Sequence, residues 1–547
     1  MPATPTFPDD LNLARYYLFD RIDEGLGGKT ALRYGDRHWT YATVAERTRA
    51  VASLLASRDV DVRRGERVLI VLPDTPPFAW TFFGTLRAAA VVAMGNPESP
   101  IEQLDYLVRY TRATAVVTLP RVAEKLALTR EVRRVFLVPE TATGADPEAP
   151  IDRDLVRSLS ARDARIVELA KAIAGVTPLD DDALPVTARD EPAIWLFTSG
   201  STGEPKANVH AHRDFAFNTE VYAKRTVGYR KDDVTVSVPR LYFVYATGTN
   251  LMFPFAVGAT VGLFSERPTP EALTRAIATY RPTVVTNVPT MLGKLLEHDA
   301  AAPADAKLDL SSVRFSLSAG EALPEALLTR WLARFKSEVY DGIGSAEMFH
   351  IYASNRPGDV KPGSLGKVVE GYELQVLPED APGPGATPCA PGEIGVLWVK
   401  GDSVSFGYWL DRDKSFRTFH GHWCRTGDLF RVDEEGYLYF AGRADELLKV
   451  SGLWVSPLEV EECLCKHAAV SLAAVIGVEE AGLLKPKAFV VLRDGARVTE
   501  AELQEFVKAR LAKHKYPRFV EFVADLPKND RGKIDRKALR ARAGGGA

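Results

Sequence analysis

The chain has 547 residues, of which 46% are hydrophobic and 26% are charged, and its formal net charge at pH 7 is -3. Such a length exceeds what one ordinary hydrophobic core holds, so we expect a large domain of several layers and at least one smaller domain. The composition is typical of a globular protein and excludes a fibrous, disordered or membrane-embedded chain. The near-neutral charge provides no basic surface for nucleic acid or an anionic membrane.

Four cysteines are scattered along the chain: Cys389, Cys424, Cys463 and Cys465. This sparse pattern predicts reduced thiols in a cytosolic compartment and not a disulfide framework. The first residues, MPATPTFPDDLNLARYY, do not form a basic segment followed by an apolar one, and no apolar stretch reaches the roughly 18 residues that a membrane span needs. We therefore expect a cytoplasmic protein without a membrane partner.

In the longer, first part of the chain, short apolar runs typical of buried strands alternate with helix-like segments. RVLIVLP (67–73) is a predicted strand, and PFAWTFFGTLRAAA (77–90) is a predicted helix. Further predicted strands are TAVVTL (114–119), RRVFLV (133–138), PTVVTNVP (282–289) and VRFSLSAG (313–320). This alternation predicts an α/β fold with mainly parallel sheets covered by helices.

The pattern changes near residue 380, where PEDAPGPGATPCAPGEIG (378–395) is a loop rich in proline and glycine. The alternating runs GVLWVKG (395–401) and GYLYFAGR (436–443) follow it and predict a small antiparallel or barrel-like subdomain.

The last part of the chain predicts a compact α+β module. Its predicted helices are 456–467 and 499–514, the second opened by a capping pattern at Thr499 and Glu502, and its predicted strands are 473–478 and 487–492. We place the main domain boundary at Asp445, which gives a large domain of residues 1–444 and a small domain of residues 445–547.

One short run, TSGSTGEPK (198–206), directly follows the apolar run AIWLF (193–197). A turn of small residues after a strand offers backbone N–H groups and hydroxyls to anionic oxygens, and Lys206 adds a positive charge. The spacing excludes a Walker loop, because Pro205 stands where the second glycine of that motif is required. By itself the run could be a solvated turn between a strand and a helix.

Together with four later runs, TSGSTGEPK resembles the adenylate-forming acyl-CoA ligases over nearly the whole chain. The later runs, in the order of that family, are SAGEALP (318–324), YDGIGSAE (340–347), RTGD (425–428) with Gly442 and Arg443, and LPKNDRGKIDR (526–536). The resemblance implies a large N-terminal domain of parallel βα sheets with a small β-barrel-like subdomain, and a small mobile C-terminal domain. It also implies a two-step reaction, in which a carboxylate and ATP give an acyl adenylate and pyrophosphate before coenzyme A takes the acyl group.

The same resemblance assigns the ATP site. It implies that Glu347 binds Mg²⁺, that Asp428 binds the ribose with help from Arg443, and that Lys533 is the catalytic lysine of adenylation. The residues it places on the β and γ phosphates are Thr198, Ser199, Gly200, Ser201, Thr202, Gly203 and Lys206. Those that it places around the adenine are Ala319, Gly320, Glu321, Asp341, Gly342 and Ile343. Without this likeness, Glu347 could begin a helix, Asp428 could lie in a surface turn and Lys533 could be one more solvated lysine.

Because Lys533 and the phosphate loop belong to different predicted domains, we expect the small domain to move, and the resemblance implies a hinge at Asp445. The resemblance implies that the movement brings a coenzyme A channel to the adenylate. The residues expected on coenzyme A are Lys449, Ser451, Gly452, Leu453, Trp454, Tyr516 and Arg518, with Lys515 nearby.

Within the family, YFVYATGTNLMFPFAVGAT (242–260) and DGIGSAEMFHIYASNRPGDVKPGS (341–364) look most like the benzoate-type aryl-CoA ligases. This likeness implies a flat pocket for a small aromatic acid, such as benzoate, an aminobenzoate (anthranilate) or a hydroxybenzoate, lined by Val244, Tyr245, Ala319, Ile343, Gly344 and His350. One position departs from the pattern, since Ala346 stands where a threonine usually contacts the α-phosphate, and Ser345 is the possible substitute.

Other features of the sequence do not indicate a functional site. HGHWC (420–424) and the Cys463/Cys465 pair lack the spacing of a metal site, and His210 and His212 are explained as the start of the following helix. Two other functions stay open: an aryl-acid adenylating enzyme that loads a carrier protein, and a non-catalytic nucleotide-binding module of the same fold. We expect small-molecule partners only, with the protein acting as a monomer or a homodimer.

Overall fold

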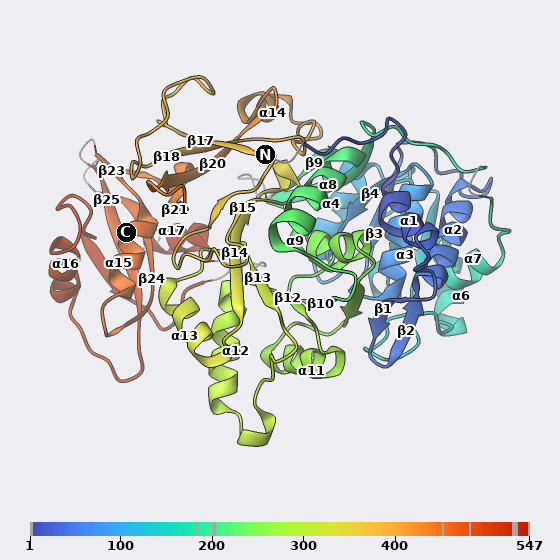
Figure 1. Ribbon diagram of the computed structural model, residues 1–547, viewed down its shortest axis with the longest axis horizontal. Coiled ribbons are helices and arrows are strands. Elements are labelled where there is room, and N and C mark those ends of the chain that lie inside the picture. The colour runs from blue at the N-terminus through green and yellow to red at the C-terminus, as the bar shows by residue number, and fades with distance from the viewer. Residues whose placement is uncertain are drawn as a thin grey trace. The chain divides into compact units, whose positions relative to one another are not determined.

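The computed structural model describes residues 4–180, 183–199, 204–450, 453–480, 483–527 and 534–544. The chain divides into two compact units, Met1–Leu374 with Val399–Cys424 and Gln375–Trp398 with Arg425–Ala547 (Figure 1). Among the described residues, no helix is both long and apolar enough to cross a membrane. All four cysteines are free thiols.

A seven-stranded sheet in the first unit has the order β7–β6–β5–β3–β4–β8–β9, and its pairs are parallel except for β8 with β9. Its strand β3 (Arg67–Val71) is apolar after the first residue and buried, as expected of a parallel strand that is covered on both faces. The other strands of the sheet are β4 (Val91–Met94), β5 (Ala115–Thr118), β6 (Arg134–Leu137), β7 (Ile166–Glu168), β8 (Pro192–Ser199) and β9 (Pro205–Ala211).

A nine-stranded sheet in the same unit has the order β16–β15–β14–β13–β12–β10–β11–β1–β2. The pairs from β14 to β1 are parallel, and the strands at both ends of the sheet pair antiparallel. Its strands are β1 (Thr30–Tyr34), β2 (Arg37–Thr40), β10 (Val234–Ser237), β11 (Thr260–Leu263), β12 (Val284–Asn287), β13 (Phe315–Ser318), β14 (Glu338–Gly344), β15 (Ile351–Ser354) and β16 (Lys367–Val368).

Some helices of the first unit start at recognisable capping residues. Thr40 accepts a hydrogen bond from the N–H of Thr43 at the start of α2, and Thr269 followed by Pro270 opens α11. The helices are α1 (Asp20–Asp23), α2 (Tyr41–Ala56), α3 (Pro76–Arg87), α4 (Ile101–Thr111), α5 (Pro120–Ala123), α6 (Arg153–Arg162), α7 (Leu169–Ala174), α8 (His212–Asn218), α9 (Val244–Thr247), α10 (Phe253–Ala256), α11 (Pro270–Tyr280), α12 (Pro289–Ala301), α13 (Glu325–Phe335) and α14 (Arg412–Thr418).

Shorter elements join these helices and strands. They are the π-helical turns η1 (Arg15–Phe19), η3 (Thr219–Val227) and η4 (Gly248–Met252), the 3-10 turns η5 (Ala304–Ala306) and η6 (Ala346–Met348), and strand β19 (Phe419–His420).

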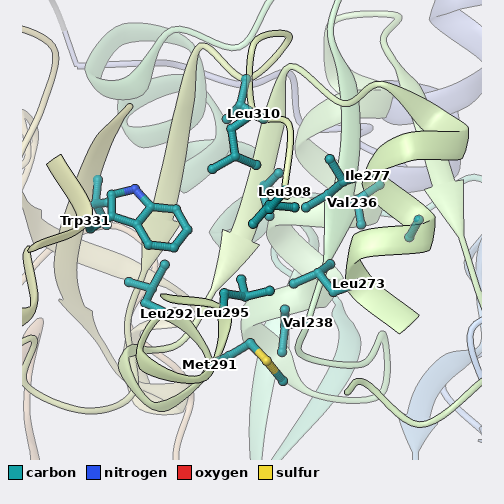
Figure 2. Close-up of a cluster of buried hydrophobic side chains, with 14 of the residues drawn as sticks. Val236, Val238, Leu273, Ile277, Met291, Leu292, Leu295, Leu308, Leu310 and Trp331 are labelled. Atoms are coloured by element: carbon teal, nitrogen blue, oxygen red, sulfur yellow. The ribbon is translucent and has the colours of Figure 1, made fainter. Parts of the chain in front are cut away.

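A hydrophobic core covers one face of the nine-stranded sheet, where α12 packs against α11 and α13 (Figure 2). Leu273 and Ile277 of α11 meet Val236 of β10, and Leu292 of α12 and Trp331 of α13 extend the same cluster. These apolar side chains recur every three or four residues along their helices, which is the spacing of one buried helix face. The helices therefore support the strands whose ends carry the predicted nucleotide residues.

The second unit contains the strands β17, β18, β20 and β21, then a hairpin, and then a three-stranded sheet of order β24–β25–β26. Helix α15 packs on β24, and Val475, Ala488 and Leu503 are among the residues of its core. The elements are β17 (Glu373–Leu377), β18 (Gly395–Lys400), β20 (Trp423–Val432), β21 (Leu438–Arg443), η7 (Ala444–Glu446), β22 (Leu448–Val450), β23 (Leu453–Val455), α15 (Pro457–Cys465), β24 (Val470–Glu480), β25 (Leu483–Leu492), α16 (Glu500–Lys508), β26 (Phe519–Phe522) and α17 (Arg536–Gly544).

The predicted α/β fold class is confirmed, and most predicted elements appear within a few residues of their expected bounds. The capping pattern at Thr499 and Glu502 is present: the N–H of Thr499 donates to the carboxylate of Glu502, whose own N–H donates to the hydroxyl of Thr499. The helix after it is shorter than predicted, because α16 ends at Lys508 and the chain turns toward β26. The expected hinge, Asp445, falls in η7 and stays a prediction.

Candidate active site

The phosphate-loop candidate connects β8 to β9. In the antiparallel pairing of these strands Thr198 stands opposite Lys206, and Ser199 stands opposite Pro205. The predicted loop residues between them, Gly200, Ser201, Thr202 and Gly203, lie outside the described residues. Thr198 and Lys206 therefore mark the two sides of the loop where it leaves the sheet.

A segment far along the chain runs beside the free edge of β9. The N–H of Phe406 donates to Val209 O at 2.9 Å, the N–H of Val209 donates to Gly407 O at 3.0 Å, and the N–H of Trp409 donates to Ala207 O at 2.9 Å. Strand β9 consequently has a hydrogen-bonded neighbour on each side, and its backbone is fixed where the loop ends.

Two tyrosines of α4 hold the backbone on both sides of the phosphate-loop lysine. Tyr106 and Tyr110 stack with ring centroids 5.2 Å apart. The Tyr106 hydroxyl donates to Pro205 O at 3.1 Å, while the Tyr110 hydroxyl accepts from the N–H of Ala207 at 3.4 Å and donates to Trp409 O at 2.6 Å. Tyr110 thereby joins β9 to the segment beside it.

The Lys206 ammonium forms an ion pair with the Asp411 carboxylate. Both side chains are largely buried, and the hydrogen bond from Lys206 holds the pKa of Asp411 below its ordinary value. Asp411 also caps α14 by accepting from the N–H of Lys414 at 3.2 Å. An anion that binds Lys206 must therefore compete with a carboxylate that is already in place.

Glu347 lies in the 3-10 turn η6, where contacts fix both its backbone and its side chain. Its carbonyl accepts from the N–H of Ser405 at 2.9 Å, and its Oε1 accepts from the Tyr408 hydroxyl at 2.7 Å. Burial, together with the adjacent carboxylate, raises the pKa of Tyr408, so the phenol stays a neutral donor. Among the described residues, no donor reaches the second carboxylate oxygen, Oε2.

A strained backbone turn follows Glu347. Phe349 has φ +66° and ψ -61°, and the N–H of His350 donates to Met348 O at 2.9 Å, which makes a γ-turn with positive φ. This conformation is rare for a bulky residue and costs on the order of 1–3 kcal/mol. The buried Phe349 ring offsets the cost by packing on Phe215, with ring centroids 4.3 Å apart.

The predicted adenine residues lie at the carboxyl ends of two adjacent parallel strands. Ala319, Gly320 and Glu321 follow β13, while Asp341, Gly342 and Ile343 are in β14, and Ser318 pairs with Asp341. Burial raises the pKa of Asp341 to about 7, although the Ser318 hydroxyl and the N–H of Leu323, 3.3 Å from Oδ2, favour the charged form. The two runs that the sequence predicts as one wall are thus brought together.

His350 lies in a cluster of aromatic rings, of which Tyr245 alone is a predicted aryl-acid residue. Its Nε2 donates to Tyr245 O at 3.0 Å, and the ring lies within 4.8 to 5.6 Å, between centroids, of Tyr222, Tyr245, Phe253 and Phe349. Burial lowers the pKa of His350 to about 4, so the ring is neutral at physiological pH. Its Nδ1 and the Tyr245 hydroxyl are buried without a hydrogen-bond partner among the described residues.

Glycine is required at the base of this cluster. A Cβ on Gly344 would lie 2.5 Å from His350 O, and one on Gly248 would lie 2.6 Å from the His350 ring. Val244 and Tyr245 stand at the start of α9, so α9 and the turn after Glu347 supply opposite parts of the same aromatic cluster.

The second unit contains the remaining candidates that the structure describes. Asp428 of β20 pairs with Arg443 of β21, and Arg443 Nη1 donates to Asp428 Oδ1 at 2.7 Å. The Arg518 guanidinium lies 3.6 Å from the centroid of the Tyr516 ring, and Lys515 forms an ion pair of 2.6 Å with Glu459.

The other coenzyme A candidates fall on the hairpin of β22 and β23, in which Lys449 pairs with Trp454 and Leu453 begins β23. Ser451, Gly452 and the catalytic candidate Lys533 lie outside the described residues.

Several residues that fix the backbone and side chains of this site belong to no sequence motif. Tyr110, Tyr408 and Asp411 contact partners that are distant in sequence, and nothing near them in the sequence distinguishes them. His210 is a partial exception, since Asp214 follows it by four residues. Its explanation as the start of α8 is wrong, because His210 lies in β9 and its ring bonds to Ala346 O at 2.6 Å, while α8 begins at His212.

Two family models match the chain. Residues 19–409 match the family model described as AMP-binding enzyme, and residues 459–533 match the model described as AMP-binding enzyme C-terminal domain. The benzoate–CoA ligase of Thauera aromatica is 38% identical over 99% of this chain and 98% of its own length.

Two further relatives act on related acids. The 4-hydroxybenzoate–CoA/benzoate–CoA ligase of Rhodopseudomonas palustris is 35% identical over 98% of this chain and 95% of its own length. The crystal structure of the anthranilate CoA ligase AuaEII in complex with anthranoyl-AMP superposes with a TM-score of 0.83, at 32% identity over 98% of each chain. The resemblance inferred from the motifs is confirmed, and the chain belongs to the family of AMP-binding, adenylate-forming enzymes.

Proposed function

We propose that this chain is an aryl-CoA ligase of the benzoate type, which activates a small aromatic acid with ATP and transfers it to coenzyme A. One observation carries the proposal: Glu347 and His350 stand on the same turn. The carboxylate of Glu347 is held beside the strand that bears Lys206, and His350 is held inside an aromatic cluster. A reaction between a nucleotide phosphate and an aryl carboxylate needs two such sites in contact.

For the nucleotide, we propose that Thr198 and Lys206 bind the β and γ phosphates together with the loop between them. Asp341 and its neighbours would enclose the adenine. Ser345 is a suitable donor to the α-phosphate in place of the missing threonine, because its hydroxyl is buried without a partner among the described residues. In the second unit, Asp428 would bind the ribose hydroxyls, with Arg443 orienting the carboxylate.

Mg²⁺ fits the donor set around Glu347. Carboxylate and phosphate oxygens are the ligands that this hard cation prefers, and Oε2 of Glu347 has no donor among the described residues. The described residues contain no group of three or more His, Cys, Asp or Glu side chains that could hold a metal ion together. A bound Mg²⁺ would neutralise phosphate charge, and Glu347 would be the residue of this chain that holds it.

For the aryl acid, we propose a pocket formed by Val244, Tyr245, Ile343, Gly344 and His350, with Ala319 at its wall. Aromatic rings and a neutral imidazole suit a flat, mostly apolar ligand that has one polar end. The relatives act on benzoate, 4-hydroxybenzoate and anthranilate by their names, and these acids are the first candidates for this chain.

We further propose that residues 445–547 form a mobile domain that brings Lys533 to the carboxylate and the α-phosphate during adenylation. Turning about Asp445 would then present residues 449–454 to the adenylate, with Tyr516 and Arg518 on the coenzyme A nucleotide. Coenzyme A sulfur would attack the acyl carbon, form the thioester and release AMP.

The experiment measures pyrophosphate release from ATP and Mg²⁺ with a panel of aryl and aliphatic acids, with and without coenzyme A. We expect release with small aryl acids and formation of the aryl thioester when coenzyme A is present. Release without any thioester would favour a carrier protein as the acceptor, and no release with any acid would leave a non-catalytic nucleotide-binding module.

A further inference from the structure

A buried histidine and a buried aspartate meet at the start of α8. His210 Nδ1 lies 2.9 Å from Asp214 Oδ2, and both side chains are almost completely buried. Asp214 is fixed independently of the histidine, since its Oδ2 also accepts from the N–H of Ala211 at 3.0 Å in a helix-capping arrangement. The aspartate is therefore a rigid support for one side of the imidazole ring.

The other side of the ring faces the turn that carries Glu347. His210 Nε2 lies 2.6 Å from Ala346 O, across 136 residues of sequence. A carbonyl oxygen only accepts hydrogen bonds, so Nε2 carries a proton and donates it. Asp214 keeps the ring in this orientation through its contact with Nδ1.

This hydrogen bond controls the peptide group just before Glu347. The carbonyl of Ala346 and the N–H of Glu347 belong to one planar unit, so fixing that oxygen fixes the plane from which the Glu347 side chain departs. The neighbouring contacts act elsewhere: Ser405 holds the carbonyl of Glu347, and Tyr408 holds its Oε1. His210 thus contributes the constraint on the amino side of the carboxylate.

The same strand joins this constraint to the phosphate-loop lysine. Lys206 and His210 are four residues apart on β9, and residues at that separation lie on one face of a strand. A displacement of β9 would therefore move the lysine and the turn of Glu347 together.

We propose that His210, supported by Asp214, is a positioning residue that orients the Glu347 carboxylate toward the metal of MgATP. The inference rests on the proposed function, in which Glu347 holds Mg²⁺. Residues that orient a metal ligand in this way change metal affinity by roughly 10-fold to 100-fold when they are replaced.

Three substitutions of His210 distinguish the hydrogen bond at Nε2 from the contact at Nδ1. His210→Gln places an amide nitrogen near the position of Nε2 and keeps the donor to Ala346. His210→Asn keeps a polar group near Nδ1 only, and His210→Phe keeps neither. The buried His212→Phe is the matched control, because His212 bonds to the N–H of Leu13 at 3.2 Å and makes no contact with the turn.

The measurement is Mn²⁺ binding to the full chain by electron paramagnetic resonance, with α,β-methylene-ATP present, alongside the KM values for ATP and for the aryl acid. We expect His210→Asn and His210→Phe to weaken Mn²⁺ binding by roughly 10-fold or more, and His210→Gln to recover most of it. The KM for the acid should stay within about twofold, and His212→Phe should lower thermal stability without changing Mn²⁺ affinity.

Wild-type Mn²⁺ affinity in His210→Asn would overturn the inference and leave the proposed function intact. If the wild-type chain binds no Mn²⁺ with the nucleotide, the metal role of Glu347 fails and the inference fails with it. Should His210→Phe not fold, the comparison of His210→Asn with His210→Gln still decides the question.

Discussion

At the scale of single residues, Lys206 is a candidate for binding a phosphate, but its ammonium already contacts another anion. The ammonium is paired with Asp411, and on the role proposed for Lys206 a phosphate would have to compete with this carboxylate. A partly buried ion pair of this kind contributes about 1 kcal/mol. The measured affinity for ATP should thus be lower than that of a site with a free lysine.

Replacing Asp411 by asparagine tests this competition. The asparagine side chain keeps an oxygen that can cap α14 but loses the charge, so we expect the dissociation constant of α,β-methylene-ATP to fall by roughly fivefold. Isothermal titration calorimetry measures it, and Asp413→Asn, an exposed neighbour in the same helix turn, serves as the control. Unchanged or weaker nucleotide binding by Asp411→Asn would show that the aspartate does not compete.

The stability of the fold should depend on pH through one buried residue, Asp341. Its pKa rises from 3.8 to about 7 on burial, so between these values the folded chain binds a proton that the unfolded chain does not. The resulting contribution to stability is fully present below pH 3.8 and is lost as the pH rises through 7. The free energy of unfolding falls by about 4 kcal/mol through this group.

The variant Asp341→Asn has a neutral side chain at every pH. Relative to the wild type, its stability against denaturant should therefore increase as the pH is raised from about 5 to about 8. Chemical denaturation at both pH values provides the comparison, with the exposed Asp494→Asn as a control whose difference from the wild type stays constant. A constant difference for Asp341→Asn would contradict the raised pKa.

At the scale of elements, β9 is the strand around which the candidate site is organised. It pairs with β8 on one side and with residues 406–409 on the other, and Tyr110 of α4 bonds to both β9 and that segment. The hydrogen bonds therefore come from three separate parts of the chain. Loss of one of them should change the position of the phosphate-loop lysine without unfolding the sheet.

Tyr110→Phe removes two of these hydrogen bonds and Tyr106→Phe removes one. We expect a stability loss of about 1–2 kcal/mol for Tyr110→Phe and less for Tyr106→Phe, since buried groups are left unpaired. In steady-state kinetics the KM for ATP should rise in the same order, while the KM for the aryl acid stays unchanged. An equal rise in both KM values would indicate a general distortion of the unit.

The elements themselves follow well from local sequence. The apolar run at 67–73 becomes β3, and the capping pair Thr499 and Glu502 starts α16, because periodicity and capping act over a few residues. The end of α16 is missed, since beyond Lys508 the chain leaves the helix to reach β26. The contact of Tyr110 with Trp409 spans 299 residues and that of His210 with Ala346 spans 136, and no local pattern encodes such pairs.

At the scale of the whole molecule, Arg536, the last residue of the run LPKNDRGKIDR, is hydrogen-bonded to residues near the predicted hinge. Arg536, three residues after Lys533, donates to Glu446 at 3.1 Å and to Glu461 at 3.0 Å. Glu461 also accepts from the N–H of Val475 at 2.6 Å. On the proposed hinge, a rotation about Asp445 would consequently carry Arg536 together with Glu446 and Glu461 as one connected body.

Lys533→Ala distinguishes the two half-reactions. If the lysine serves adenylation alone, the variant loses pyrophosphate release by several orders of magnitude but still forms thioester from a supplied aryl adenylate and coenzyme A. Both half-reactions can be followed by chromatography of the aryl adenylate and the thioester. Equal loss of the two would refute the alternation of the small domain.

The γ-turn at Phe349 has a thermodynamic consequence for how the ligands bind. It leaves only two residues between Glu347 and His350, and its strained backbone has little freedom to absorb a shift of either side chain. On the proposed roles, the metal–nucleotide site and the aryl-acid site therefore share one rigid connection. By linkage, any acid that tightens MgATP binding is itself bound more tightly by the same factor when MgATP is present, so the coupling between the two substrates becomes a property of this single turn.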